Sequence, residues 1–247
     1  MHETWYERHL LPYLLDIACN ISPIRKQRMK VIPQAEGNVL EVGIGTGLNL
    51  PFYDRSRVKL IVGVDPGLRM HRLALQRSLQ AGLDVRLIGL SAEKIPVDDA
   101  SFDSVVCTYT LCTIPDPLQA LKEMKRALKP GGKLLFSEHG KAPQENVERW
   151  QARLQPYWKK LAGGCMLNRD VPALLEEAGF EPRFQSRYLP GPKILSYHYW
   201  GEAVATSRNT CGHGAQPHCF LKTQIELQHC GRSAGFVPDD QQRLSVG

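Results

Sequence analysis

The stretch Asn38-Val-Leu-Glu-Val-Gly-Ile-Gly-Thr-Gly-Leu-Asn-Leu50 decides the fold of this chain. Its hydrophobic start leads into Gly43, Gly45 and Gly47, which alternate with other residues. A second hydrophobic run, Leu60-Ile-Val-Gly-Val-Asp65, ends in an acid. A doubly wound α/β domain binds a nucleoside with these elements in order: a strand, a glycine turn, a helix, and a second strand that ends in an acid.

The glycine spacing indicates which kind of nucleoside is bound. The turn reads E-x-G-x-G-x-G from Glu41 to Gly47, whereas the dinucleotide pattern GxGxxG needs a glycine where Leu48 stands. This disfavours a nicotinamide oxidoreductase. A nucleoside with an amino-acid tail needs open space beside the turn, which glycine provides, and an acid near its ammonium. We therefore expect Glu41 near that ammonium and Asp65 at two ribose hydroxyls. The alternative is a tight turn without a ligand.

Composition is that of a globular protein with enough chain for a substantial core. The chain has 247 residues, of which 43% are hydrophobic and 23% charged, with a net charge of +6. A basic cluster, Arg25-Lys-Gln-Arg-Met-Lys30, is interpreted as the solvated face of a helix, with phosphate or an anionic membrane as the alternative. Basic residues interleaved with aromatic ones are absent, so we expect no nucleic-acid partner.

The absence of targeting segments and of a disulfide pattern predicts the cellular compartment and the oxidation state of the cysteines. It has no run of 18 apolar residues and no signal sequence at its start, so we expect a cytoplasmic protein without a transmembrane span. Cys19, Cys107, Cys112 and Cys165 are scattered, without the pattern of a disulfide framework. In a reducing compartment they are expected to be free thiols.

Hydrophobic runs alternate with helical patterns, which predicts a parallel sheet with helices on both faces. Asp116 and Pro117 are typical of a helix start, and Lys129-Pro-Gly-Gly132 is typical of its end. Helices are also expected at 144–161, at 171–178 and in the gaps between strands. The expected strands are 38–43, 59–65, 85–90, 102–109, 133–139, 181–189 and 197–204.

Three regions follow from these patterns. Residues 1–35 form a helical segment, interpreted as a lid or as packing on the sheet edge; a peripheral membrane contact is the less favoured reading. Residues 36–204 form the main domain. Residues 205–247 form a polar tail that we expect to be poorly ordered. Its pairs Cys211-x-His213, His218-Cys219 and His229-Cys230 have zinc-ligand chemistry, but their spacing fits no common zinc pattern, so we expect no bound metal.

Further motifs resemble those of the class I S-adenosylmethionine-dependent methyltransferases, of the UbiE-like, methyltransferase domain 11 type. They are Leu90-Ser-Ala-Glu-Lys-Ile-Pro96, Ser101-Phe-Asp-Ser-Val-Val106 and Ala127-Leu-Lys-Pro-Gly-Gly-Lys133, and the resemblance spans about residues 36 to 140. It implies a Rossmann-like seven-stranded sheet with one antiparallel strand, and S-adenosylmethionine as cofactor. Ser91 stands where the family usually has an acid, so adenine recognition passes to Ala92 and Glu93. The implied cofactor contacts are Glu41, Gly43, Gly45, Thr46, Gly47, Asn49, Asp65, Pro66, Ala92, Glu93 and Thr108.

Three local motifs are similar to a narrower branch, the membrane-associated alkyl thiol S-methyltransferases and their bacterial relatives. They are Cys107-Thr-Tyr-Thr-Leu-Cys-Thr-Ile114, Ser137-Glu-His139 and Gly164-Cys-Met-Leu-Asn-Arg169. This resemblance extends to about Val204 and implies a small, lipophilic acceptor, with a thiol as the suggested class. A lipid or quinone methyltransferase and a non-catalytic S-adenosylmethionine-binding module remain alternatives.

Methyl transfer from a sulfonium is an in-line displacement, so a base is needed only if the acceptor must lose a proton. Residues 108–111, Glu138 and His139 follow strands whose ends meet at the crevice of this fold. His139 is a candidate base, with a structural hydrogen bond as the alternative, and Glu138 is expected to orient a neighbour. Cys107 and Cys112 are expected to be packing residues. Aromatic residues lie either in the core or in an apolar acceptor pocket: Tyr109, Trp158, Tyr188 and Tyr197.

Overall fold

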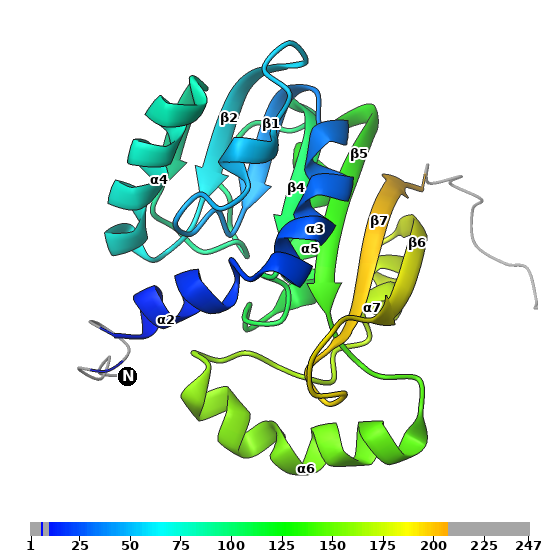
Figure 1. Ribbon diagram of the computed structural model, residues 1–247. Coiled ribbons are helices and arrows are strands. Elements are labelled where there is room, and N and C mark those ends of the chain that lie inside the picture. The colour runs from blue at the N-terminus through cyan, green and yellow to red at the C-terminus, as the bar shows by residue number, and fades with distance from the viewer. Residues whose placement is uncertain (1–5, 7–9, 207–247) are drawn as a thin grey trace, which may run out of the picture. The chain divides into compact units, whose positions relative to one another are not determined.

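Seven strands form one sheet in the order β3-β2-β1-β4-β5-β7-β6 (Figure 1). The structure is a computed structural model that describes residue 6 and residues 10–206. The predicted tail therefore lies outside the described residues, apart from its first two positions. The strands are β1 (Gly37–Val42), β2 (Val58–Val64), β3 (Val85–Ile88), β4 (Phe102–Thr108), β5 (Leu128–His139), β6 (Phe180–Tyr188) and β7 (Tyr197–Ala205).

The strand directions confirm the expected sheet. β1 pairs in parallel with β2 and β4, β2 with β3, and β4 with β5. β7 lies between β5 and β6 and runs antiparallel to both, which confirms the single antiparallel strand. Because β1 to β5 are parallel, their carboxyl ends meet at one edge of the sheet.

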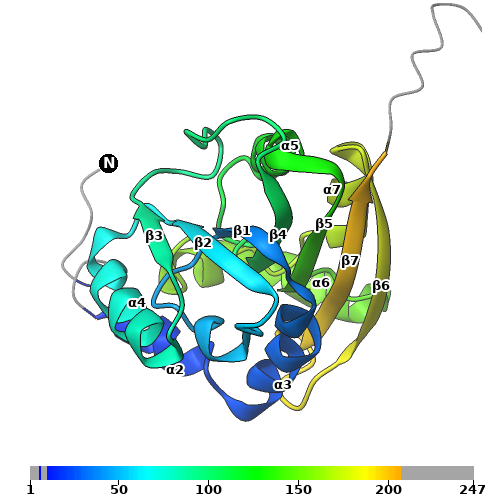
Figure 2. The ribbon, with the colours of Figure 1, turned by 90° about the horizontal axis from the view of Figure 1, so that it is seen from above.

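Each face of the sheet carries its own hydrophobic core, because side chains alternate along the strands. Leu40, Val105 and Leu134 belong to one core, and their neighbours Val39, Val106 and Leu135 belong to the other. Figure 2 shows α5 (Pro117–Ala127) and α7 (Val171–Glu177) on one face, and α3 (Ser22–Val31) and α4 (Leu68–Ala81) on the other. Helices on both faces are thus confirmed.

The start of α5 is as predicted, but its end differs. The Asp116 side chain accepts a hydrogen bond of 3.0 Å from the Gln119 backbone N–H, and Pro117 is the first helical residue. The helix ends at Ala127, and Lys129-Pro-Gly-Gly132 lies inside β5 rather than in a connecting turn. This strand begins five residues before position 133, because Leu128 already pairs with Phe102, beside an irregularity in the β4–β5 register.

The expectation of a helix after the glycine turn is wrong. Between β1 and β2 the structure has turns and the short 3-10 helix η2 (Leu50–Phe52), and residues 89–101 between β3 and β4 are turns as well. Gly43, Gly45 and Gly47 have φ values of +74°, +52° and +80°, which no right-handed helix contains. Pro51 lies just beyond them and removes a further backbone donor.

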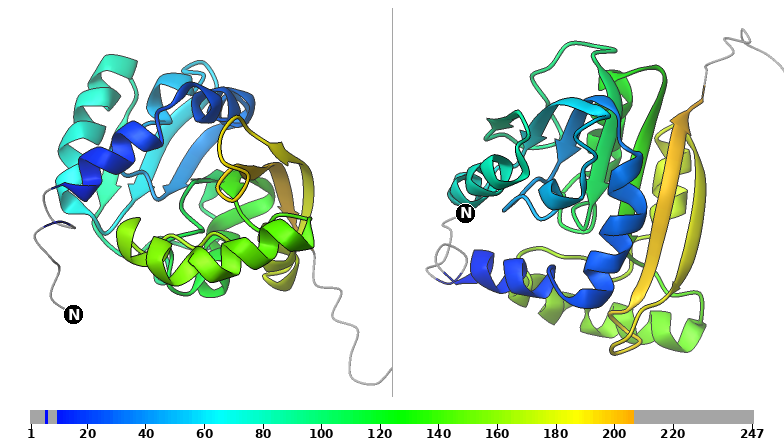
Figure 3. Two further views of the ribbon diagram at one scale, coloured as in Figure 1. Left: turned by 60° about the horizontal axis from the view of Figure 1, so that its bottom comes forward. Right: turned by 45° about the horizontal axis from the view of Figure 1, so that its top comes forward.

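α2 (Leu11–Ala18) and α6 (Glu145–Leu161) lie at the carboxyl ends of the parallel strands (Figure 1). Figure 3 (left) turns these ends toward the viewer and shows the two helices framing them. α2 and α3 confirm the two helical stretches predicted before the first strand, and η1 (Ile32–Gln34) continues from α3. Among the helices that the structure describes, none is both long and apolar enough to cross a membrane.

Candidate functional site

A cavity of about 410 Å³ opens at the carboxyl ends of the parallel strands. One part of its wall comes from α2 and α3. A second part comes from the glycine turn and the ends of β2, β4 and β5. The rest comes from α6 and the loop before β7. The residues that line it include Asp16, Cys19, Ile24, Arg28, Glu41, Gly43, Gly45, Thr46, Asn49, Asp65, Thr108, Tyr109, Thr110, Cys112, His139, Trp158, Cys165, Leu167, Leu189, Leu195 and His198.

The glycine turn and Asp65 form one end of this cavity. The Asp65 carboxylate accepts hydrogen bonds from the backbone N–H groups of Gly45 (3.0 Å) and Gly67 (2.7 Å). A Cβ atom at Gly45 would make ordinary van der Waals contacts, at 3.8 Å or more from its neighbours, whereas one at Gly43 would collide with Thr110 at 2.1 Å. Gly43 therefore permits close packing, and Gly45 leaves room for a ligand beside Asp65.

Glu41 lies deeper, at the end of β1, and is 1% exposed. Its carboxylate accepts hydrogen bonds from the Tyr53 hydroxyl (2.8 Å) and from the Asn49 amide (2.9 Å). Burial raises the pKa of Glu41 to about 7, although both hydrogen bonds oppose that shift. The predicted acid is therefore in the cavity wall, already bonded on both oxygens and close to its midpoint of ionisation at neutral pH.

Arg28 is a site residue that the sequence reasoning missed. The basic cluster 25–30 was interpreted as a solvated face, but Arg28 is 5% exposed and lines the cavity. Its Nη1 donates to Asn49 Oδ1 (2.5 Å) and to Thr108 Oγ1 (2.7 Å), while its Nε has no partner among the described residues. The signal was present in the spacing, because Ile24, Arg28 and Val31 fall on one helical face.

α2 is attached to the glycine turn by an ionic contact. Arg77 on α4 donates to Asp16 Oδ1 (2.8 Å) and to the carbonyl oxygen of Thr46 (2.8 Å), and the Thr46 hydroxyl also donates to Asp16. Hydrogen bonds from Arg77 and Thr46 lower the pKa of Asp16, against the raising effect of its partial burial. Thr46 thus touches the N-terminal helix as well as the cavity.

Tyr109 occupies the middle of the cavity wall, directly after β4. It is one of two described residues other than glycine with positive φ, at +54°. Its ring lies 4.9 Å from the Arg28 guanidinium carbon and 5.7 Å from the His198 ring. The Tyr109 ring therefore contacts both Arg28 on α3 and His198 on β7.

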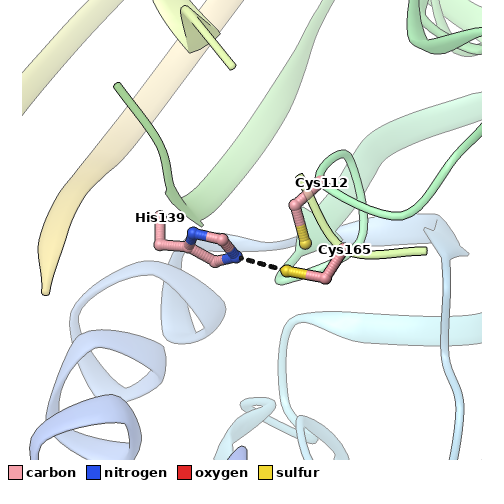
Figure 4. A group of neighbouring side chains, drawn as sticks. All are labelled: Cys112, His139 and Cys165. Carbon is pink, nitrogen blue, oxygen red and sulfur yellow. Dashed lines mark hydrogen bonds between the residues drawn. The ribbon is translucent and has the colours of Figure 1, made fainter. Parts of the chain in front are cut away.

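Cysteine and histidine side chains lie close together in the part of the cavity near β5 and β7. Figure 4 shows the His139 ring directed at Cys165, with Cys112 beside it. His139 Nε2 lies 3.2 Å from Cys165 Sγ, and the Trp158 indole donates to the same sulfur at 3.3 Å. Hydrogen bonds from the Cys112 thiol and from His139 lower the pKa of the Cys165 thiol, despite burial. Burial alone would lower the pKa of His139, but the contact with Cys165 raises it.

The sequence does not predict this cluster, because along the chain Cys165 is only one of several scattered thiols. Cys107, by contrast, is fully buried in the core, and burial raises its pKa well above the usual thiol value. The pKa of Cys112 is also raised, first by its hydrogen bond to Cys165. The four described cysteines are free thiols.

Glu138 does not face the cavity, and neither does Leu111, which corrects the expectation for both. Each is completely buried. Glu138 Oε1 accepts backbone hydrogen bonds from Thr110 (2.8 Å) and Leu111 (3.0 Å), and Oε2 has no partner in the described part of the chain. Burial raises the pKa of Glu138 to about 7. Its contacts hold the loop after β4, which carries Tyr109 and Cys112.

Four predicted cofactor residues are not part of the cavity wall: Gly47, Pro66, Ala92 and Glu93. Glu93 accepts hydrogen bonds from the Ser91 hydroxyl and, at 3.3 Å, from the Asp116 backbone N–H. Of the four aromatic candidates, Tyr109 and Trp158 line the cavity, whereas the rings of Tyr188 and Tyr197 contact each other edge to face, with centroids 4.9 Å apart. The predicted adenine contacts stay predictions.

Comparison with known proteins agrees with this arrangement. The methyltransferase domain family matches residues 40–136. Thiol S-methyltransferase TMT1B of Rattus norvegicus is 36% identical over 176 residues, which cover 68% of this chain and 71% of that protein. Phosphatidylethanolamine N-methyltransferase of Cereibacter sphaeroides is 33% identical over 124 residues, 48% of this chain and 60% of the relative. A putative methyltransferase from Bacillus halodurans has the same fold, with a TM-score of 0.57, 19% identity, and coverage of 72% and 95% of the two chains.

Proposed function

Because this chain belongs to the class I S-adenosylmethionine-dependent methyltransferases, near the thiol S-methyltransferases, we propose that its methyl acceptor is a small, lipophilic thiol. The observation that carries the proposal is the sulfur- and imidazole-lined end of the cavity, with apolar walls from Leu167, Leu189 and Leu195. Such a site buries an apolar molecule and places a few polar groups at one point of it.

S-Adenosylmethionine would occupy the other end. We assign its ribose hydroxyls to Asp65, because this carboxylate lines the cavity beside Gly45, which has no side chain to block it. The methionine ammonium is assigned to Glu41 and the methionine carboxylate to Arg28, since both charges lie in the same stretch of wall around Asn49. The part of the cavity at β5 and β7 would then remain for the acceptor. Gly43, Thr46 and Thr108 complete this part of the proposed site.

The reaction forms one bond and breaks another. The acceptor sulfur attacks the methyl carbon while the bond from that carbon to the sulfonium breaks, and its electron pair returns to the departing sulfur. Most of the acceleration comes from alignment of the two sulfurs. A thiol must also lose its proton, and His139 is the candidate base, because its Nε2 meets the cavity beside Cys165. Glu138 supports the loop and takes no part in proton transfer.

We further propose that residues 10–35 act as a lid over residues 36–204. α2 and α3 line the cavity through Asp16 and Arg28, and the contact of Asp16 with Arg77 fastens α2 to the glycine turn. A lid of this kind excludes water from the reacting sulfurs.

The test is transfer of a labelled methyl group from S-adenosylmethionine to a panel of alkyl thiols, phenols, amines, phosphatidylethanolamine and a demethylated quinone. Transfer to alkyl thiols, rising with chain length, is the expected outcome. Failure with every thiol would overturn the proposed acceptor. Binding of S-adenosylhomocysteine by calorimetry, without turnover of any acceptor, would instead identify a cofactor-binding module.

A lipid or quinone acceptor is the second candidate, favoured by exposed apolar side chains on the two helices that frame the cavity. They include Tyr13 and Ile17 on α2 and Tyr157 on α6, which are 63%, 67% and 74% exposed. Flotation with anionic vesicles tests it: the combined change Tyr13→Ser and Ile17→Ser would abolish binding and lipid methylation together. A cytoplasmic location stays a prediction, which fractionation of the producing cells would test.

A further inference from the structure

We propose that Cys112, His139 and Cys165 form a zinc site whose fourth coordination position opens into the cavity. Their ligand atoms all lie within 4.8 Å of one another, and Figure 4 shows the three side chains converging. They come from three separate segments: the loop after β4, the end of β5, and the connection between α6 and α7. Two of the side chains are buried and the third is half-buried.

The spacing suits a tetrahedral ion. Bond lengths of about 2.3 Å to sulfur and about 2.0 Å to nitrogen place neighbouring ligand atoms about 3.5–3.8 Å apart in a tetrahedron. His139 Nε2 and Cys165 Sγ are already 3.2 Å apart, and the third atom lies within 4.8 Å of both. Small side-chain rotations would therefore close the site.

The ligand types favour zinc over the harder cations. Two thiolates and one imidazole are typical ligands of zinc, whereas magnesium and calcium require oxygen ligands. Two thiolates also neutralise a divalent ion, which suits a site between buried segments. Glu138, the nearest acid along the chain, is bonded instead to the loop backbone.

The surroundings hold the ligands in place. The Met166 backbone N–H donates to the Cys112 carbonyl oxygen at 2.8 Å, which ties the two cysteine segments together. Arg169 donates to the carbonyl oxygens of Leu111 (2.5 Å) and Ile114 (2.6 Å) on either side of Cys112. The Trp158 indole donates to Cys165 Sγ at 3.3 Å, a contact that would stabilise a metal-bound thiolate.

Three protein ligands with an open fourth position are typical of a catalytic zinc site rather than a structural one. All three ligand residues line the cavity, so the open position can accept a molecule from it. The next step rests on the proposed function: the acceptor thiol binds zinc as a thiolate, and its proton passes to water. The bound sulfur then takes the methyl group, and the neutral thioether leaves. In the zinc-loaded enzyme His139 is thus a ligand, and the metal replaces the base.

The first experiment measures zinc stoichiometry in the full-length, reduced protein. Because the tail contains Cys211, Cys219 and Cys230, all measurements use a background in which these three are serine. We expect one tightly bound zinc per chain in this background, and loss of stoichiometric binding in Cys112→Ser, in Cys165→Ser and in His139→Asn. Cys19→Ser, a cysteine outside the cluster, is the matched control and should keep its zinc. Undiminished binding of S-adenosylhomocysteine verifies the fold of each variant.

A graded test uses Trp158, which would touch the zinc-bound sulfur but not the ion. Trp158→Phe should weaken zinc binding by about tenfold, since loss of a hydrogen bond to a ligand costs about 10–100-fold in metal affinity. Trp150→Phe, an exposed tryptophan on the same helix, should leave the affinity unchanged.

Cobalt substitution separates the metal site from the acceptor. An alkyl thiol added without S-adenosylmethionine should shift the cobalt absorption bands of the wild-type site. Bound cobalt with bands that no thiol shifts, in a protein that methylates no thiol, would leave the metal site standing and overturn the proposed function. Thiol methylation in a protein that binds no zinc would overturn the metal site and support the proposed function. Zinc lost with the tail cysteines, or a disulfide between Cys112 and Cys165 in the reduced protein, would also overturn the metal site.

Discussion

The Arg28 guanidinium donates a hydrogen bond of 2.7 Å to the Thr108 hydroxyl, across 80 positions of sequence. The contact joins α3, in the N-terminal segment, to the carboxyl end of β4. It places a buried positive charge at the centre of the cavity wall, where no carboxylate forms an ion pair with it among the described contacts. The methionine carboxylate of S-adenosylmethionine is the partner that we propose for this charge.

Replacing Arg28 tests that assignment. Arg28→Met keeps the length of the side chain and removes its charge, so affinity for S-adenosylhomocysteine should fall by about 10–100-fold, the usual effect of losing a charged hydrogen bond. Arg28→Lys should lose less. Calorimetric titration measures both, and Arg25→Met, an exposed residue of the same helix, is the control. Equal affinity in Arg28→Met and Arg25→Met would contradict the assignment.

Asp65 should affect cofactor affinity in two ways: through hydrogen bonds to the ribose, and by holding the glycine turn in place. Asp65→Ala removes a carboxylate that accepts from Gly45 and Gly67, and affinity for S-adenosylhomocysteine should fall by at least about tenfold. Asp84→Ala, an exposed acid after the next helix, should bind like the wild type. Equilibrium titration of both variants decides the matter; an unaltered affinity in Asp65→Ala would mean that the ribose lies elsewhere.

Cofactor affinity should depend on pH through Glu41. Burial raises the pKa of Glu41 to about 7, so this carboxyl is partly protonated near neutral pH in the ligand-free protein. The cofactor ammonium favours the ionised carboxylate, so binding releases a proton and affinity should rise with pH between about 6 and 8, by at most about tenfold per pH unit. Titration in buffers of different ionisation enthalpy measures the released proton. Glu41→Gln should abolish both effects; a pH dependence that survives in Glu41→Gln would refute this explanation.

The Asp16–Arg77 pair should control the lid. Its side chains are only 18% and 24% exposed, so solvent screens this pair less than it screens a surface ion pair. Asp16→Asn should speed hydrogen exchange of α2 while leaving exchange in β1 and β4 unchanged. A reversed pair, Asp16→Arg with Arg77→Asp, should restore part of the protection. Equal exchange of α2 in Asp16→Asn and the wild type would show that the contact does not fasten the helix.

The sequence predicted the sheet well because its signals are local. Each strand is a short hydrophobic run, and both the Asp116 cap and the breaking glycines act within a few residues. The seven strand positions and the cofactor class follow from such signals. The helix expected after the glycine turn failed for a local reason as well, since positive φ values at the three alternating glycines Gly43, Gly45 and Gly47 prevent a helix from starting there.

The missed site residues depend on contacts between distant segments. Cys112 and Cys165 are 53 positions apart in the sequence, and only the folding of α6 across the strand ends brings them together with His139. The burial of Arg28 follows from the way α3 packs against the sheet, which composition cannot reveal. The spacing places Arg28 on the same helical face as Ile24 and Val31. The charged neighbours Arg25, Lys26 and Lys30 nevertheless make the segment resemble a solvent-exposed basic cluster.

The Tyr109 ring contacts both Arg28 and His198, so in the proposed arrangement it lies where the donor end of the cavity meets the acceptor end. If donor and acceptor bind as proposed, substitutions in the segments around Cys112, Cys165 and His198 should alter which molecule is methylated and leave donor binding unchanged. A family built in this way can acquire new acceptors by drift in one half of a cavity while the other half is preserved. For engineering, the same division means that libraries aimed at new acceptors should leave residues 41–65 untouched.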